Sequence, residues 1–156
     1  MTQEHAGRLR RAHLDDATRL LSLWEHMFDE MGAPTSTGWR EHARDWLTRF
    51  VDDDSAARIP VIDVAGEIVA SAVGTVEVGV PNPHSPTGRA VRLVNVFTLA
   101  PYRGRGFATE LIGDVIEWAQ EMAVDRIDLS ATPEGQRIYG RLGFTRTSAP
   151  RMKRML

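Results

Sequence analysis

The fold is decided by residues 90–123, which read AVRLVNVFTLAPYRGRGFATELIGDVIEWAQEMA. The first part of this stretch is apolar and rich in β-branched residues, which predicts a strand. A turn is expected at Pro101-Tyr102, and two glycines follow it closely. From Ala108 onward the apolar residues recur at i, i+3, i+4 and i+7, which is the spacing of a helix. The sequence therefore predicts a strand, a Gly/Arg turn at residues 103–108, and a helix that opens directly out of that turn.

The beginning of this helix has the chemistry of an anion site. The N–H groups of a first helical turn have no partner inside the helix, and they lie at the positive end of its dipole. Gly104 and Gly106 lack a Cβ, so the chain can adopt positive φ and an anion can approach the backbone closely. Arg103 and Arg105 add positive charge. We expect the turn to bind a phosphate or a pyrophosphate.

Two common phosphate motifs do not fit this turn. A P-loop ends in Gly-Lys-Ser/Thr, and residues 103–109 contain no lysine. A dinucleotide fingerprint reads Gly-x-Gly-x-x-Gly, whereas Thr109 stands where the third glycine is needed. The phosphate site must belong to another class.

Residues Arg103 to Ala108 have the pattern Arg-x-x-Gly-x-Ala, which resembles the acetyl-CoA pyrophosphate motif of the GNAT N-acetyltransferase superfamily. Residues 136–144, which read QRIYGRLGF, look like the second motif of that family, a short helix that carries a tyrosine and ends in Leu-Gly-Phe. The chain departs from the family pattern on the central strand, where many members have a glutamate and residues 90–99 have no carboxylate, and again before the second motif. Thr132 stands where the family often has asparagine, and Gly135 stands where it usually has alanine.

Length and composition exclude several classes of protein. A chain of 156 residues suits one domain, here residues 1–156. A net charge of −2 gives no basic field, so nucleic acid is not an expected partner. There is no cysteine, and the five histidines lack metal-ligand spacing, so no metal is expected. No run of 18 apolar residues is present, so we expect a cytoplasmic protein without a membrane partner.

The order of elements along the chain also resembles the GNAT fold. The first half is expected to contain a strand at 8–12, a helix from an N-cap at Asp15 to Gly32, a helix at 39–50 and a hairpin of 60–64 and 68–80. The stretch at 90–123 follows, and then a strand at 126–131. The last elements are a helix with Thr132 as N-cap and Pro133 at its first position, and at most two short edge strands after Phe144. The resemblance implies an α/β (α+β) fold. Its sheet is mixed and mostly antiparallel, with six to seven strands, about four flanking helices and a splay at the central strands.

The resemblance further implies where acetyl-CoA binds. In the family, the central strand pairs with the pantetheine arm as if the arm were an added strand, which assigns this contact to Val96, Phe97 and Thr98. The pyrophosphate would lie against the turn and the first residues of the helix, namely Arg103, Gly104, Arg105, Gly106, Phe107, Ala108 and Thr109.

Acetyl transfer to an amine needs a neutral nucleophile, a polarised thioester carbonyl and a proton for the leaving thiolate. An alkyl ammonium with a pKa near 10.4 is neutral in only about one molecule in 10³ at pH 7. A phenol with a pKa of about 10 stays protonated and can donate to the thiolate. Tyr139 is therefore the expected general acid, and it holds the position of the family's acid. A main-chain N–H of Val96 or Phe97 is expected to hold the carbonyl oxygen.

The base is left open, because residues 90–99 contain no carboxylate. The candidates are Glu77 on the preceding strand, Asn95 as a residue that holds water, and His84 in a proline-rich loop. For the acceptor, Trp24, Phe28 and Trp39 border the junction of the two N-terminal helices, which in the family covers the acceptor pocket. Asp29 or Glu30 is a candidate to attract an amine.

The function implied is an acetyl-CoA-dependent N-acetyltransferase acting on a small-molecule or peptide amine. Members of the family often dimerise, so a homodimer is one expected assembly. Two other interpretations stay open at this point. One is a catalytically silent CoA-binding or regulatory module, and the other is a nucleotide-binding protein that uses the Gly/Arg turn for ATP.

Overall fold

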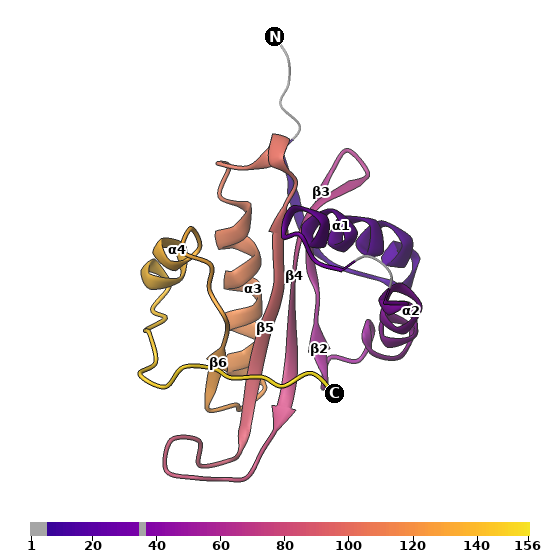
Figure 1. The fold of residues 1–156 in the computed structure, drawn as a ribbon. Helices are drawn as coiled ribbons and strands as arrows, with labels where there is room; N and C mark the ends of the chain where they lie inside the picture. The colour runs from indigo at the N-terminus through magenta and orange to yellow at the C-terminus, as the bar shows by residue number, and fades with distance from the viewer. Residues whose placement is uncertain (1–5, 35–36) are drawn as a thin grey trace.

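The fold is organised around an open sheet, as the computed structural model shows for residues 6–34 and 37–156 (Figure 1). Within these residues the sheet has six strands in the order β1-β3-β4-β5-β6, and β2 pairs with β4. The strands are β1 (Arg8–Arg11), β2 (Ala57–Arg58), β3 (Pro60–Val64), β4 (Glu67–Val78), β5 (Arg89–Thr98) and β6 (Arg126–Asp128). Every pairing is antiparallel except that of β5 with β6. The sequence-based prediction of a mixed, mostly antiparallel sheet is confirmed.

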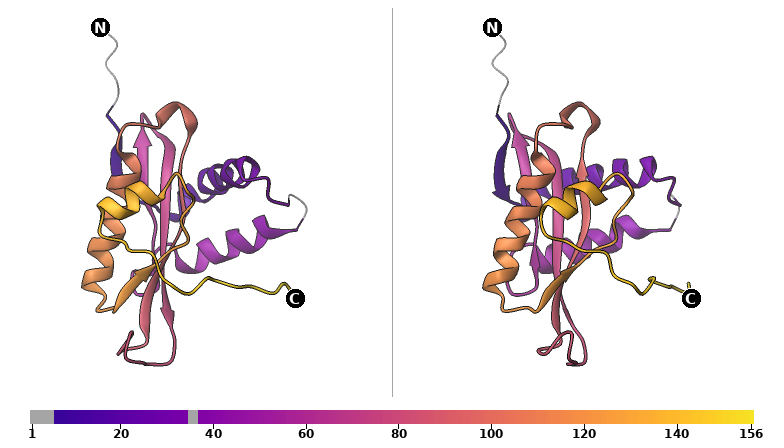
Figure 2. Two further views of the ribbon diagram at one scale, coloured as in Figure 1. Left: turned by 60° about the vertical axis from the view of Figure 1, so that its left-hand side comes forward. Right: turned by 90° about the vertical axis from the view of Figure 1, so that its left-hand side faces the viewer.

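Helices cover both faces of the sheet. The helices of the described residues are α1 (Ala17–Glu30), α2 (Trp39–Phe50), α3 (Phe107–Glu121) and α4 (Gln136–Arg141), with short 3-10 turns η1 (Leu14–Asp16) and η2 (Ala100–Tyr102). The views in Figure 2 place α1 and α2 on one side of the sheet and α3 and α4 on the other. The helices at 39–50 and after residue 106 begin and end close to where the periodicity predicts. In the described part of the chain, no helix is long and apolar enough to cross a bilayer.

Two hydrophobic clusters lie between the sheet and its helices, one on each face. Successive residues of a strand point to opposite faces, so Val61 packs with Leu20 and Leu47 under α1 and α2, while Ile62 packs with Leu111 under α3. All five side chains are fully buried. Apolar side chains that point alternately to the two faces of the sheet thus hold a layer of helices on each face.

A glycine sets the close approach of α3 to the sheet. A Cβ added to Gly74 in β4 would lie 2.8 Å from Cγ1 of Val115 and 3.1 Å from Cζ3 of Trp118, which is closer than side-chain carbons normally approach. Only glycine therefore lets α3 lie at this depth. The depth matters because the first turn of α3 forms one wall of the candidate site.

The sheet opens along β5. The parallel pairing with β6 is limited to Ala90 with Arg126, Val91 with Ile127 and Arg92 with Asp128. From Leu93 to Thr98 the β5 backbone has no strand of the described chain on that side. The predicted splay of the central strands is therefore confirmed, and it leaves main-chain groups of β5 free for an extended ligand.

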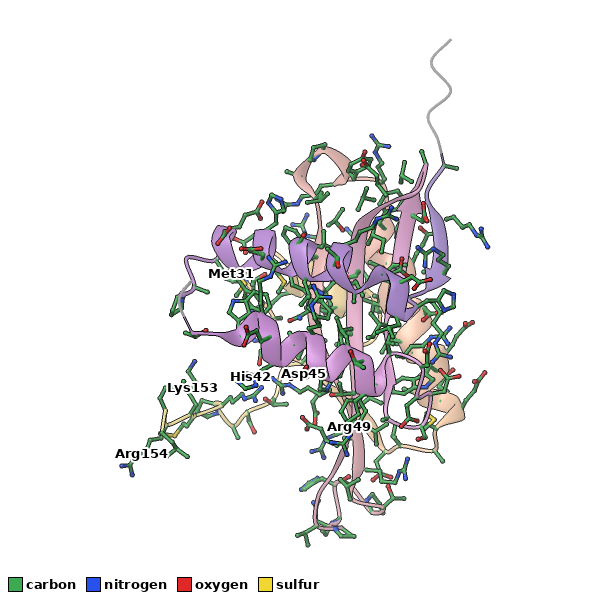
Figure 3. All side chains as sticks on the ribbon, turned by 90° about the vertical axis from the view of Figure 1, so that its right-hand side faces the viewer. Met31, His42, Asp45, Arg49, Lys153 and Arg154 are labelled. Atoms are coloured by element: carbon green, nitrogen blue, oxygen red, sulfur yellow. The ribbon has the colours of Figure 1, made fainter. Side chains whose placement is uncertain are left out.

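Some predicted elements are absent or shorter. The strand expected at 126–131 ends at Asp128, the hairpin strand expected to reach Val80 ends at Val78, and residues after Phe144 form no strand. Pro150 has no N–H for a ladder, and the basic run around it lacks the alternation of a half-buried strand. Figure 3 shows this last segment, with Lys153 and Arg154 labelled, extending away from the sheet. The short β2, which the sequence did not suggest, completes the six strands.

Two predicted N-caps are wrong. Asp15 is exposed and helix α1 begins after Asp16, whose carboxylate accepts the backbone N–H of His13 at 2.8 Å and both terminal nitrogens of Arg10 at 2.8 and 2.9 Å. The contact of Asp16 with Arg10 of β1 explains why Asp16, and not Asp15, precedes the helix. At the predicted start of α4, the Thr132 hydroxyl accepts a hydrogen bond from the N–H of Gly135 at 3.2 Å and closes a separate turn. Pro133 lies in that turn, and α4 begins only at Gln136.

Candidate active site

The site is centred on a bulge in β5. Ser71 of β4 faces Phe97 and Val73 faces Val94, so two residue steps on β4 oppose three on β5. Asn95 takes up the extra residue with φ of 52°, a left-handed value that asparagine tolerates better than most residues. As a result, Asn95 lines one cavity and its neighbour Val96 lines another.

The larger of the two, called cavity 1 below, has a volume of about 750 Å³ and lies between β5, the Gly/Arg turn and α4. Every residue that the sequence assigned to the cofactor lines it except Arg105, namely Val96, Phe97, Thr98, Arg103, Gly104, Gly106, Phe107, Ala108 and Thr109. Arg105 instead lies over Tyr102, with its Cζ 5.2 Å from the ring centroid. Met27, Glu30 and Ile138 also line the cavity, although none of them was assigned to the cofactor, because they come from other elements and no local pattern links them to the turn.

The Gly/Arg turn presents unpaired donors. Gly104 and Gly106 have φ of 80° and 81°, which glycine adopts at no steric cost. No hydrogen bond joins the N–H groups of residues 104–109 to any acceptor of the described chain, and Glu110 is the first residue of α3 whose N–H is paired, with Gly106 at 3.2 Å. These donors lie at the positive end of a 15-residue helix. The arrangement suits a phosphate group.

Arg103 is held in place by three contacts. Its Nε donates to the carbonyl oxygen of Thr98 at 2.9 Å, its Nη2 donates to Glu30 at 2.8 Å, and its Cζ lies 5.4 Å from the ring centroid of Phe97. The guanidinium is therefore fixed at the wall of cavity 1, with part of its charge balanced by Glu30.

Tyr139 lies on α4 and lines cavity 1. Its ring packs edge to face against Phe144 at 5.7 Å between centroids. Burial raises the pKa of its phenol above 10, so the hydroxyl stays protonated at neutral pH. No described residue forms a hydrogen bond with that hydroxyl. A Cβ on Gly135 would lie 3.0 Å from Cε2 of Tyr139, so glycine at this position leaves room for the ring.

A second, smaller cavity, called cavity 2 below, has a volume of about 260 Å³ and lies on the α1 and α2 side of the bulge. Trp24, Phe28 and Trp39, which the sequence assigned to the acceptor, all line it. Trp46 lines it too, and the spacing of Trp39, Ala43 and Trp46 on one face of α2 was the signal that could have indicated this. Val94 and Asn95 form its floor together with residues of β4.

The base candidates are dispersed. Glu77 is exposed and pairs with Ala90 at the far end of β5, and His84 is exposed in the loop after β4, so neither lines a cavity. Asn95, the third candidate, lines cavity 2. Of the two acidic candidates for the acceptor, Glu30 lines cavity 1, and Asp29 lines neither cavity. No three acidic or histidine side chains of the described residues gather as a metal site.

The chain belongs to the acetyltransferase (GNAT) family, whose model matches residues 20–144. That span includes the bulge, the Gly/Arg turn and Tyr139. Comparison with curated protein sequences gave no match.

Solved structures share the fold over nearly the full chain. A predicted acetyltransferase from Clostridium acetobutylicum, crystallised with acetyl-CoA, has a TM-score of 0.86 at 20% identity, covering 96% of each chain. A GCN5-related N-acetyltransferase from Ralstonia eutropha has a TM-score of 0.84 at 25% identity, covering 97% of this chain and 99% of the other. Glucosamine-6-phosphate N-acetyltransferase from Arabidopsis thaliana has a TM-score of 0.76 at 16% identity, covering 96% and 98%.

Proposed function

We propose that the protein is an N-acetyltransferase that moves the acetyl group of acetyl-CoA directly to a primary amine. The observation that carries this proposal is the meeting of two cavities at one bulge, where Val96 lines cavity 1 and Asn95 lines cavity 2. The donor and the acceptor can then approach a single point of β5 from opposite sides. Direct transfer needs such an approach, because the amine itself must reach the thioester carbon. No cysteine is present to carry the acetyl group as a thioester.

Acetyl-CoA is the acetyl donor, and cavity 1 is where we place it. The diphosphate is assigned to the free N–H groups of residues 104–109, with Arg103 beside them. The extended pantetheine arm then runs along Val96, Phe97 and Thr98, where the splay leaves β5 without a neighbouring strand, and pairs with it as an added strand would. This places the thioester next to the bulge.

The reaction follows from the groups around the bulge. The neutral amine attacks the carbonyl carbon, and the N–H of Val96 stabilises the negative charge that develops on the oxygen. When the intermediate collapses, the carbon–sulfur bond breaks and the thiolate takes a proton from the hydroxyl of Tyr139. The amine's surplus proton leaves through water held at Asn95. Glu77 and His84 line neither cavity, so neither is assigned a role in this mechanism.

The donor and acceptor cavities share one sheet, and both hydrophobic clusters pack on it, which supports residues 1–156 as a single acetyltransferase domain. A catalytically silent CoA-binding module remains the second candidate, and one observation favours it: no carboxylate of the described residues lines cavity 2.

Calorimetric titration with acetyl-CoA, followed by thiol release in the presence of an amine panel, tests the proposal. Binding together with thiol release supports the transferase. Binding without release on any amine supports the silent module, and no binding at millimolar acetyl-CoA rejects both. Competition by ATP for the same site would support the nucleotide-binding interpretation instead.

A further inference from the structure

Four aromatic side chains surround cavity 2, and they come from two helices. Trp24 and Phe28 lie on α1, and Trp39 and Trp46 lie on α2. Trp24 is 3% exposed and its indole N–H donates to the Ser71 hydroxyl at 3.3 Å. Phe28 and Trp39 meet edge to face at 5.2 Å between centroids. The ring positions are therefore fixed by contacts outside the cavity as well as by each other.

The rest of the wall is small and apolar except at one end. Ala43 of α2 and Val73 and Val94 of the floor are apolar, and the only polar side chains among the described lining residues are those of Thr75 and Asn95. Polarity is thus confined to the β4–β5 side, where the bulge lies. An occupant would place its apolar part among the aromatic rings and its polar end at Asn95.

No described lining residue of cavity 2 carries a charge. Two nearby carboxylates are already paired, Glu25 with Arg40 and Glu30 with Arg103. Asp45 and Arg49 of α2, labelled in Figure 3, are exposed and line neither cavity. A polycationic amine that entered cavity 2 would lose hydration without gaining an ionic partner, which is strongly unfavourable.

The size of cavity 2 suits one ring. An apolar cavity of about 150 Å³ in another protein accepts benzene, and ligand pockets are commonly about 300–1,000 Å³. At about 260 Å³, cavity 2 can accept a ring with a short alkyl chain and is small for an oligosaccharide.

We propose that the acceptor is a primary amine on a short chain that carries an aromatic ring, and that cavity 2 binds the ring. This inference rests on the transferase function proposed above and names its substrate class. The ring lies among Trp24, Phe28, Trp39 and Trp46, and the amine lies at Asn95, beside the thioester in cavity 1. The opposite orientation would hold an ammonium against the rings by cation–π attraction, and so would keep the amine protonated and unreactive.

This orientation also bears on the missing base. Apolar surroundings disfavour the charged form of an amine, and each unit by which its pKa falls raises the neutral fraction about tenfold at neutral pH. An amine held over an uncharged cavity therefore needs less help from a carboxylate. The protons balance, because the amine loses one proton to water, the thiolate gains one from Tyr139, and the Tyr139 phenolate takes one back from water.

The first experiment compares acceptors at saturating acetyl-CoA by thiol release. We expect kcat/KM for 2-phenylethylamine and tryptamine to exceed that for spermidine and glucosamine by at least about tenfold. Equal or faster turnover of spermidine or glucosamine would overturn the inference while leaving the transferase function intact. Binding of 2-phenylethanol, which cannot be acetylated on nitrogen, is measured separately by tryptophan fluorescence. If it binds and no amine is turned over, the transferase function fails and the ring site stands; if it does not bind at 10 mM (roughly the weakest affinity of interest), the ring site is rejected.

The second experiment uses variants of α2. Trp39→Leu should lower kcat/KM for 2-phenylethylamine about tenfold and leave acetyl-CoA affinity within about twofold. His42→Leu is the matched control, because His42 is an exposed residue of the same helix with a ring side chain that lines neither cavity, and the change should leave both quantities within about twofold. Ala43→Glu places a carboxylate in the wall and should shift preference toward spermidine. An unchanged ratio of the two acceptors in Ala43→Glu, with the fold intact by circular dichroism, would count against the assignment.

Discussion

The guanidinium of Arg103 lies 2.8 Å from the carboxylate of Glu30 and joins the turn before α3 to the last residue of α1. The two residues are 73 positions apart in the chain, and both line cavity 1. A diphosphate that entered the cavity would compete with Glu30 for Arg103. The pair therefore links cofactor binding to the helix that also carries two rings of cavity 2.

Glu30→Gln should tighten acetyl-CoA binding about two- to fivefold, because it removes a negative charge from the wall and frees Arg103 for the phosphates. Both side chains are about half exposed, so the pair contributes only about 0.2–1 kcal/mol, and stability should change little. Calorimetry at low and at physiological salt measures the effect, which should shrink as salt rises. Glu25→Gln is the control, since Glu25 pairs with Arg40 and lines neither cavity. Weaker binding by Glu30→Gln would show that Glu30 serves to orient Arg103.

Gly106→Ala should weaken acetyl-CoA binding about tenfold. A Cβ at φ of 81° costs about 1–2 kcal/mol, and the turn would relax and misalign its N–H groups. Gly113→Ala is the matched control within α3, where a Cβ meets no atom within 4 Å and φ is ordinary. That change should stabilise the helix by about 0.5–1 kcal/mol and leave affinity unaltered. Equal acetyl-CoA affinities in the two variants would show that the turn does not contribute to cofactor binding.

Tyr139→Phe should lower kcat by at least about tenfold while the dissociation constant of acetyl-CoA stays the same, because only the proton donor is lost. The raised pKa of the phenol keeps it protonated through neutral and moderately alkaline pH. The wild-type rate should therefore lose its acid-dependent component only above about pH 10. A kcat that equals that of the wild type across the whole pH range would remove Tyr139 from the mechanism.

Asp16→Asn should destabilise the fold by about 1–3 kcal/mol, since it breaks a charged hydrogen-bond pair with Arg10 at a side chain only 9% exposed. The Arg10 guanidinium lowers the pKa of Asp16 below its usual value near 3.9. The stabilisation is therefore complete above that value and is lost as pH falls through it and below. Thermal melts from pH 7 to 3 should show the two proteins converging in acid. Asp15→Asn, at an exposed neighbour, should have no such effect.

The second half of the chain could be predicted well because its signals are local. The change of period after Gly106, the glycines of the turn and the Leu-Gly-Phe that ends α4 each lie within a few residues of the structure they determine. The N-cap at Asp15 failed for the opposite reason. Two adjacent aspartates are equivalent locally, and the choice between them depends on Arg10 in another element.

The candidate site was predicted most completely where one segment supplies it. The cofactor residues of 96–109 come from one continuous stretch, and all but Arg105 line cavity 1. The bulge was not foreseen, because Asn95 adopts positive φ only through its register against β4. The pairing of Arg103 with Glu30 and the place of Trp46 depend equally on how distant elements pack, which no local pattern encodes.

The extra residue in β5 allows two separate cavities to meet at one point of a single strand. Neighbouring positions of this strand line different cavities, and α2 lines only cavity 2, so α2 can be reshaped without touching the turn assigned to the donor. Substitutions in α2 would therefore alter the acceptor cavity while the turn before α3 keeps its shape.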